Sequence, residues 1–150
     1  MRDLTVLPPI EFKIEQAAKT SGLYVSTGPR SALLSDLEQA GFRVFHLDGK
    51  CIIDRSSYFQ AVAHLFEFGS HFGHNWDALA DCLTDCSWDK DDRIVVVYSD
   101  YEPFATSDPE SWAIAMEIWT STVEFWQCWQ SSVSVVFQVS GDSALSGFSL

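Results

Sequence analysis

Apolar and polar residues alternate along this chain with two different periods, and the changes of period predict an α/β order of elements. The apolar run Ile94–Tyr98 and the alternating segments Phe42–Leu47 and Val133–Val139 are typical of strands. Gly22–Ser26 is a candidate fourth strand. Helical segments between strands indicate crossover connections, which join parallel strands. We therefore predict an α/β fold in three layers, with a small parallel sheet of three or four strands packed by helices.

Helical spacing of apolar residues indicates where these connections lie. Pro29 and Gly41 frame one of them, because proline favours the start of a helix and glycine its end. The segment Asp100–Pro109 is acidic and rich in turn-forming residues, so we expect a loop there. The expected helices lie within residues 10–20, 30–40, 55–68, 72–85 and 109–130.

The chain has the size and composition of one globular domain. It has 150 residues, of which 47% are hydrophobic and 14% aromatic. We expect a single domain over residues 1–150 with its core at about 42–140. Residues 1–41 are then an N-terminal extension that supplies the candidate fourth strand and a helix, and the Gly- and Ser-rich residues 141–150 form a flexible tail.

The segment Phe72–Asp85 combines an apolar side with a row of aspartates. Asp77, Asp81 and Asp85 recur at i, i+4 and i+8, and Asn75 before them is a favourable helix N-cap. Like charges four residues apart cost a helix roughly 0.2–0.5 kcal/mol per pair, so a row of acids indicates a basic partner. The opposite arc of the helix is formed by Trp76, Leu79, Ala80, Cys82, Leu83 and Cys86.

Acidic residues are concentrated around this helix. The net charge of the chain is −12, and ten acids against Lys90 and Arg93 leave −8 between His71 and Glu110. Such a surface repels nucleic acid and anionic membranes and attracts basic proteins. No run of 18 apolar residues occurs and no signal sequence follows Met1, so we expect a cytoplasmic protein that binds neither nucleic acid nor membrane.

Two other chemistries are candidates for the same region. His71, His74 and Asp77 are ligand types at near-helical spacing and could hold zinc, although no further ligand cluster accompanies them. Asp77 and Asp81 could act as an acid–base pair, which would need a cleft that a convex helix does not offer. We therefore expect no metal site, no cofactor and no catalytic residue.

Cysteines and tryptophans are best interpreted as structural residues. The four cysteines show no disulfide pattern, so we expect free thiols, with a disulfide or metal pair of Cys82 and Cys86 as the alternative. For the tryptophans of the last helix we expect core packing, with a self-association surface as the alternative; they are Trp112, Trp119, Trp126 and Trp129.

The run FGHNWDALADCLTD at residues 72–85 resembles the signature segment of the barstar family, the intracellular inhibitors of barnase-like ribonucleases. The family pattern is an aromatic residue, Gly, any residue, Asn, any residue, then Asp-Ala-Leu, any residue, and Asp-Cys-Leu-Thr. The order of elements from about Phe42 to Val139 is also similar. The resemblance implies a barstar-like fold and a protein that is an inhibitor, without enzymatic activity of its own.

The resemblance also implies where the partner would bind. The acidic helix and its preceding loop would occupy the site where RNA phosphate binds to a ribonuclease, with Asp81 as the central contact and Asp77 beside it. Asn75 and Gly73 would shape the loop. The predicted partner-binding residues are Phe72, Gly73, His74, Asn75, Trp76, Asp77, Ala80, Asp81, Thr84 and Asp85.

This chain departs from the type member of the family at three places. His74 and Trp76 replace the residues usual there, and the segment after Thr84 is longer before Trp88. Glu124 lies only near the place where the late helix of the family contributes an acid.

Two functions therefore follow from the sequence. The chain is expected to be an immunity protein, of the toxin–antitoxin kind, that blocks a basic, barnase-like ribonuclease toxin. The alternative is a barstar-like module that binds a basic protein other than a nuclease.

Overall fold

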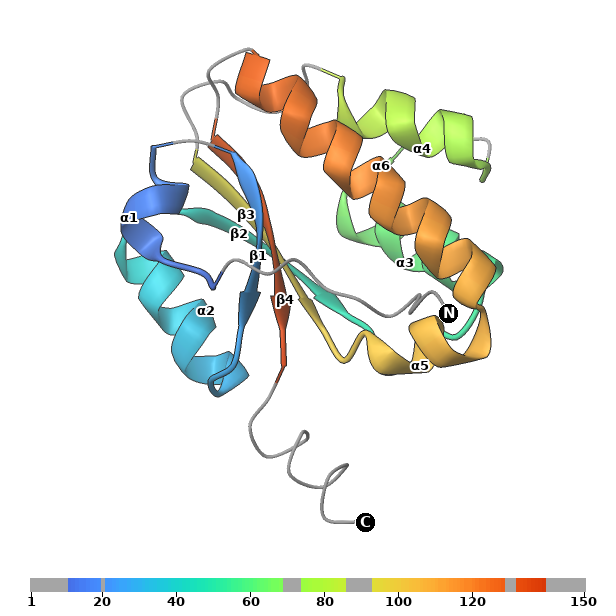
Figure 1. The fold of residues 1–150 in the computed structure, drawn as a ribbon, viewed down its shortest axis with the longest axis horizontal. Helices are drawn as coiled ribbons and strands as arrows, with labels where there is room; N and C mark the ends of the chain where they lie inside the picture. Colours follow the sequence, from blue (N-terminus) through green and yellow to red (C-terminus); the bar gives the residue numbers. More distant parts are fainter. Residues whose placement is uncertain (1–10, 20, 69–73, 86–92, 129–131, 140–150) are drawn as a thin grey trace.

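The computed structural model describes residues 11–19, 21–68, 74–85, 93–128 and 132–139. One parallel sheet lies between two layers of helices (Figure 1). In chain order the elements are α1 (Ile14–Ala17), β1 (Gly22–Ser26), α2 (Arg30–Gln39), β2 (Arg43–Asp48), α3 (Arg55–Leu65), α4 (Trp76–Leu83), β3 (Arg93–Ser99), α5 (Glu102–Ser107), α6 (Pro109–Cys128) and β4 (Ser132–Gln138).

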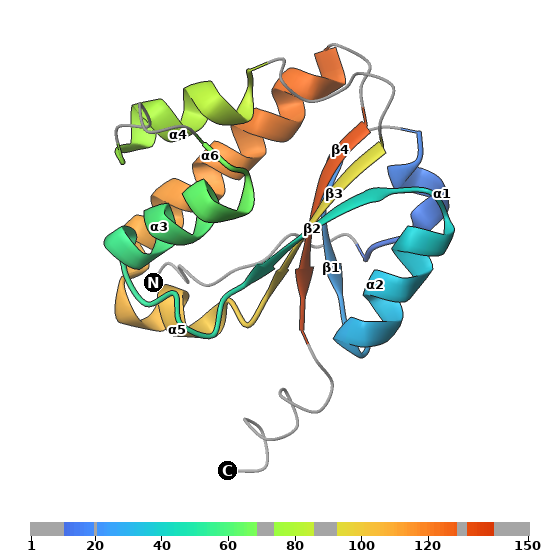
Figure 2. The ribbon, with the colours of Figure 1, turned by 180° about the vertical axis from the view of Figure 1, so that it is seen from behind.

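The strand order explains why helices lie on both faces of the sheet. The order is β1-β4-β3-β2, and all neighbouring strands are parallel. The chain moves across the sheet in one direction from β2 through β3 to β4, but in the opposite direction from β1 to β2. Because crossovers are right-handed, the β1–β2 connection lies on the other face from the later ones. Accordingly, α1 and α2 cover one face and α3 to α6 the other (Figures 1 and 2).

Alternate residues of each strand enter two separate cores. On β3, Val95 and Val97 pack with α1 and α2, whereas Ile94, Val96 and Tyr98 pack with the other layer. All seven residues of β4 are buried. A strand covered on both faces needs apolar side chains on both, which explains the continuous apolar run seen in the sequence.

The predicted strands are confirmed, each within one residue at either end, including the fourth strand Gly22–Ser26. The fold class is therefore the expected α/β arrangement with four strands. The prediction of a loop at Asp100–Pro109 was wrong, because α5 occupies Glu102–Ser107 and buries Phe104 and Ala105 against α6. The first helix is shorter than the expected 10–20 range, and the 141–150 tail lies outside the described residues.

The N-terminal extension supplies α1, β1 and α2 and thereby the cover of the second face. β1 pairs with β4 over five residues, and α2 buries Leu33 and Leu37. The side chains of Gln127 and Ser132 donate hydrogen bonds to backbone carbonyls within the extension, those of Ser21 and Ala17. The limits of a single domain at 1–150 stay a prediction, but these contacts join the extension to the sheet.

We expect Leu37→Ala to lower the free energy of unfolding by about 2–5 kcal/mol, because Leu37 has 0% exposure in the second core and the change leaves a cavity. Gln39→Ala, on the exposed side of the same helix, is the control and should change it by less than about 0.5 kcal/mol. Urea denaturation measures both. Equal effects of the two variants would mean that the extension does not contribute to the folded core.

Candidate protein-binding site on helix α4

Helix α4 begins where the sequence predicted. Asn75 is its N-cap, and the Asn75 side-chain oxygen accepts a hydrogen bond of 2.8 Å from the backbone N–H of Ala78. Asp77 lies in the first turn, where the partial positive charge of the helix N-terminus favours a carboxylate. Two features of the local sequence, a capping amide and an acid two residues later, therefore fix the start of the helix.

The two sides of α4 agree in part with its periodicity, and Cys86 of the expected apolar arc lies outside the described residues. Leu79 and Leu83 are fully buried, and the acids Asp77, Asp81 and Asp85 are exposed. None of the three carboxylates has a salt-bridge partner among the described residues. Asp85 lies one residue beyond the C-cap Thr84, so it extends the acidic row past the end of the helix. Trp76, Ala80, Cys82 and Thr84 are half-buried between the two sides.

Aromatic contacts hold the N-terminal end of α4 on α3. The ring of Trp76 lies 4.7 Å from the ring of Phe59 and 6.0 Å from that of Tyr58, measured between centroids. His74, one residue before the cap, has a left-handed backbone with φ of 53°, and its ring meets the edge of Phe59 at 6.4 Å. A non-glycine residue in this conformation is uncommon and is found where the surrounding structure imposes it.

Helix α6 holds the other end of α4. The indole N–H of Trp126 donates a hydrogen bond of 3.1 Å to the carbonyl oxygen of Leu83, and both residues are buried. The two helices lie side by side in Figures 1 and 2. The sequence placed Trp112, Trp119 and Trp126 in the core, and this is confirmed; Trp129 lies outside the described residues.

The structure brings together eight of the ten predicted partner-binding residues. His74 and Asn75 precede α4, and the helix and the turn after it carry Trp76, Asp77, Ala80, Asp81, Thr84 and Asp85. Phe72 and Gly73 lie outside the described residues. No pattern in the sequence indicates the hydrogen bond of Trp126 or the backbone conformation of His74, because both depend on which groups the fold brings near them.

The sequence also raised a metal site and an acid–base pair for this region. No group of three or more His, Cys, Asp or Glu side chains that could hold a metal is found among them, and His71 of the proposed zinc trio lies outside them. Asp77 and Asp81 are both exposed. No helix in the described part of the chain is long and apolar enough to cross a membrane.

A histidine–serine pair lies at the carboxyl ends of the strands, away from α4. His46 Nε2 and Ser99 Oγ are 2.8 Å apart. Burial lowers the pKa of His46, and Arg30 lowers it further, against the charges of Asp48 and Asp100. Although this pair has the elements of a nucleophile and a base, Ser99 is fully buried. The pair ties β2 to β3.

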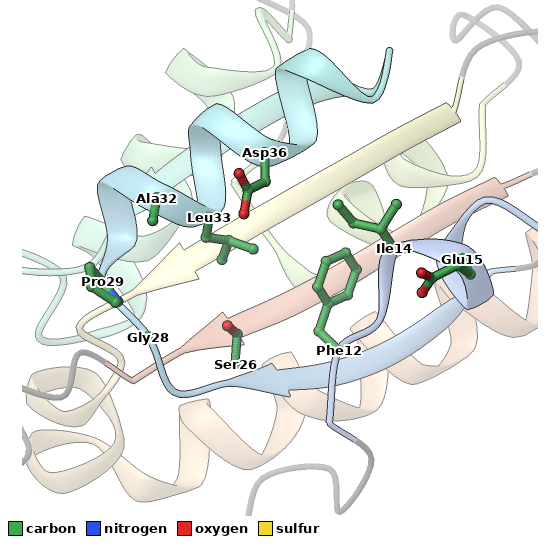
Figure 3. A pocket seen from close by; sticks show the side chains of 9 residues that line it. All are labelled: Phe12, Ile14, Glu15, Ser26, Gly28, Pro29, Ala32, Leu33 and Asp36. Atoms are coloured by element: carbon green, nitrogen blue, oxygen red, sulfur yellow. The ribbon is translucent and has the colours of Figure 1, made fainter.

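A cavity of about 370 Å³ lies on the other face of the sheet (Figure 3). It opens between α1 and α2 near the end of β1, with Phe12, Ile14 and Leu33 as apolar walls. Glu15 and Asp36 contribute carboxylates from the two helices. Because the sheet separates this cavity from α4, the two do not form one site.

The fold is a parallel sheet between two layers of helices, and one short, capped helix presents an outward row of acids. The family model for barstar, described as a barnase inhibitor, matches residues 42–139, so the chain belongs to the barstar family. The match begins just before β2 and ends just after β4, and it therefore includes α4 but not α1, β1 or α2.

One solved structure with a similar fold is that of the Aeropyrum pernix ORC2 protein in ADPNP–ADP complexes. Its TM-score is 0.52 at 11% sequence identity, and the similarity covers 96% of this chain and 45% of that chain. At this identity the likeness concerns the fold alone, and this chain spans less than half the length of the solved one. No curated protein matches the sequence.

We expect Cys82 to react slowly with thiol reagents at neutral pH. Burial raises the pKa of its thiol, and the charges of Asp85 and Asp81 raise it further, so the reactive thiolate is scarce. Cys51 and Cys128 are free and exposed and should react first. Timed alkylation followed by peptide mass spectrometry measures each rate, and denatured protein, in which all four cysteines should react, is the control. Labelling of Cys82 as fast as Cys51 would contradict the half-buried position of its side chain.

Proposed function

We propose that the protein inhibits a basic, barnase-like ribonuclease by placing the acidic row of α4 in the active site of the nuclease. The observation that carries this proposal is a helix fixed at both ends that carries three exposed aspartates, Asp77, Asp81 and Asp85, none of which has a salt-bridge partner among the described residues. Its position inside the matched barstar segment supports it. The inhibitor would act in the cytoplasm, as an immunity protein paired with a toxin.

The mechanism is replacement of phosphate by carboxylate. A ribonuclease binds the phosphates of RNA with Lys, Arg and His side chains, and a carboxylate offers the same negative oxygen acceptors. Asp81 lies in the middle of the row, so the basic groups would close around it, with Asp77 towards the loop and Asp85 towards the edge. Glu124 is exposed on α6, which packs beside α4, and could extend the acidic surface at that edge.

The physical cost of the acidic row supports a role in binding. Asp81 and Asp85 lie near the C-terminal end of α4, where the helix dipole disfavours negative charge, and no basic residue lies in the last turn. The row does not stabilise the isolated domain. It would stabilise a complex, because a basic site desolvated against these carboxylates gains charge-assisted hydrogen bonds.

We expect Asp81→Ala to weaken binding to a purified barnase-type ribonuclease by about 2–5 kcal/mol, mainly through faster dissociation, because the basic groups of the nuclease are left buried and unpaired. Its melting temperature should stay the same or rise slightly, since two like-charge i, i+4 contacts disappear. Calorimetric titration and a thermal melt of each variant measure the two effects.

Two controls make this experiment specific. Asp85→Ala, at the edge of the row, should cost less affinity than Asp81→Ala. Glu38→Ala, an exposed acid on α2 across the sheet, should cost none. If Asp81→Ala binds the nuclease like the wild type, α4 is not the inhibitory element. If it instead melts far lower, Asp81 has a structural role.

Association should also depend strongly on salt. The excess of acid around α4 attracts a basic partner over about one Debye length, roughly 8 Å at physiological ionic strength. Stopped-flow association rates should therefore fall steeply as salt rises, whereas dissociation rates should change little. The Glu38→Ala variant should retain the wild-type salt dependence. An association rate that does not respond to salt would exclude steering by the acidic surface.

A further inference from the structure

The sequence of helix α4 alone does not determine where the helix lies. It has eight residues, and isolated helices shorter than about 12–15 residues are marginal in water. Its direction must therefore come from contacts at its two ends and along its buried side. At the N-terminal end, these contacts are the Asn75 cap and the packing of Trp76 on α3.

The C-terminal end has a different problem, because the last carbonyl oxygens of a helix lack partners within it. Thr84 supplies two donors to the carbonyl of Ala80, from its backbone N–H at 3.2 Å and its hydroxyl at 2.8 Å. The N–H of Asp85 reaches the carbonyl of Cys82 at 3.3 Å. The carbonyl of Leu83 receives its hydrogen bond from Trp126, 43 residues later in the chain.

We propose that Trp126 is a positioning residue that fixes the C-terminal end of α4 and thereby aims Asp81 at the partner. Its ring has 2% exposure and is anchored in α6, a 20-residue helix, so the donor is held by the core. The bonded carbonyl of Leu83 lies two residues from Asp81. A shift of this end would therefore displace the central carboxylate.

The electrostatics of this helix end also favour a donor there. The negative end of the helix dipole lies beside Asp81 and Asp85, and the last turn has no basic residue to offset it. Besides the hydroxyl of the C-cap residue Thr84, the buried indole N–H of Trp126 supplies a donor at this end, and it comes from another helix. This inference rests on the proposed function for the role of Asp81, but the anchoring of α4 can be tested without any partner.

The experiment compares Trp126→Phe with the wild type. The variant keeps an aromatic ring and removes the N–H donor, so the Leu83 carbonyl loses its partner. Amide hydrogen exchange in α4 should become about tenfold faster, which is the effect of losing roughly one buried hydrogen bond, while exchange in β3 and β4 stays unchanged. Against a purified barnase-type ribonuclease, dissociation should be about tenfold faster and the salt dependence of association unchanged.

Trp112→Phe is the matched control. It makes the same change on the same helix, but the Trp112 indole N–H has no hydrogen-bond partner in the part of the chain that the structure describes, so α4 exchange and dissociation should match the wild type. Uniformly faster exchange across the sheet and α4 in Trp126→Phe would overturn the proposal by showing only a general loss of stability. Faster α4 exchange with unchanged dissociation would also overturn it.

Two further outcomes are distinguishable. If the wild type does not bind the nuclease, the proposed function fails, and the exchange comparison alone decides whether Trp126 anchors α4. If Trp126→Phe does not fold, the indole proton of Trp126 in the wild type gives the answer by NMR. It should exchange as slowly as the backbone amides of α4, and rapid exchange with solvent would overturn the proposal.

Discussion

The structure depends on one constraint: a parallel sheet has two apolar faces, and both must be removed from water. β3 and β4 are buried almost throughout and send alternate residues into separate cores. The segment matched by the family model supplies the helices of one face only. Residues 11–41 supply α1, α2 and an edge strand, and they close the second face over Val95, Val97 and Val136. The extension is therefore part of the hydrophobic core of this chain.

The helices that cover the other face, α3 to α6, include the acidic helix α4 and hold it in place. Four helices share that face, and α6 packs on β4, α5 and α4. Because α6 crosses the layer, it joins the sheet to α4 through Trp119, Val123 and Trp126 in a single core. The acidic row thus lies on a short helix and the turn after it. The buried side of this helix belongs to the larger of the two cores that the described residues form. Rigid support of this kind reduces the conformational entropy that a binding surface loses when its partner docks.

How much of this follows from the sequence depends on whether a feature is local or tertiary. The strands, the Asn75 cap and the two sides of α4 follow from periodicity and capping, which depend on neighbours in the chain. Helix α5 was missed because Pro103 and the surrounding acids read as a turn, although proline is favoured in a first helical turn. The Trp126–Leu83 hydrogen bond joins residues that are far apart in the chain, and the left-handed backbone of His74 depends on the structure around it. No local pattern in the sequence predicts either feature.

The two sides of α4 contribute differently to the folded core. Leu79 and Leu83 hold the helix through burial, and their exchange for polar residues would damage the core. Asp77, Asp81 and Ala80 contribute little to that core, since the acids are exposed and Ala80 carries a small side chain. Substitutions on the outer side should therefore cost little stability. His74 and Trp76 belong to both sides, because each touches Phe59 and lies beside the acidic row. A substitution at either position must therefore satisfy the packing on Phe59.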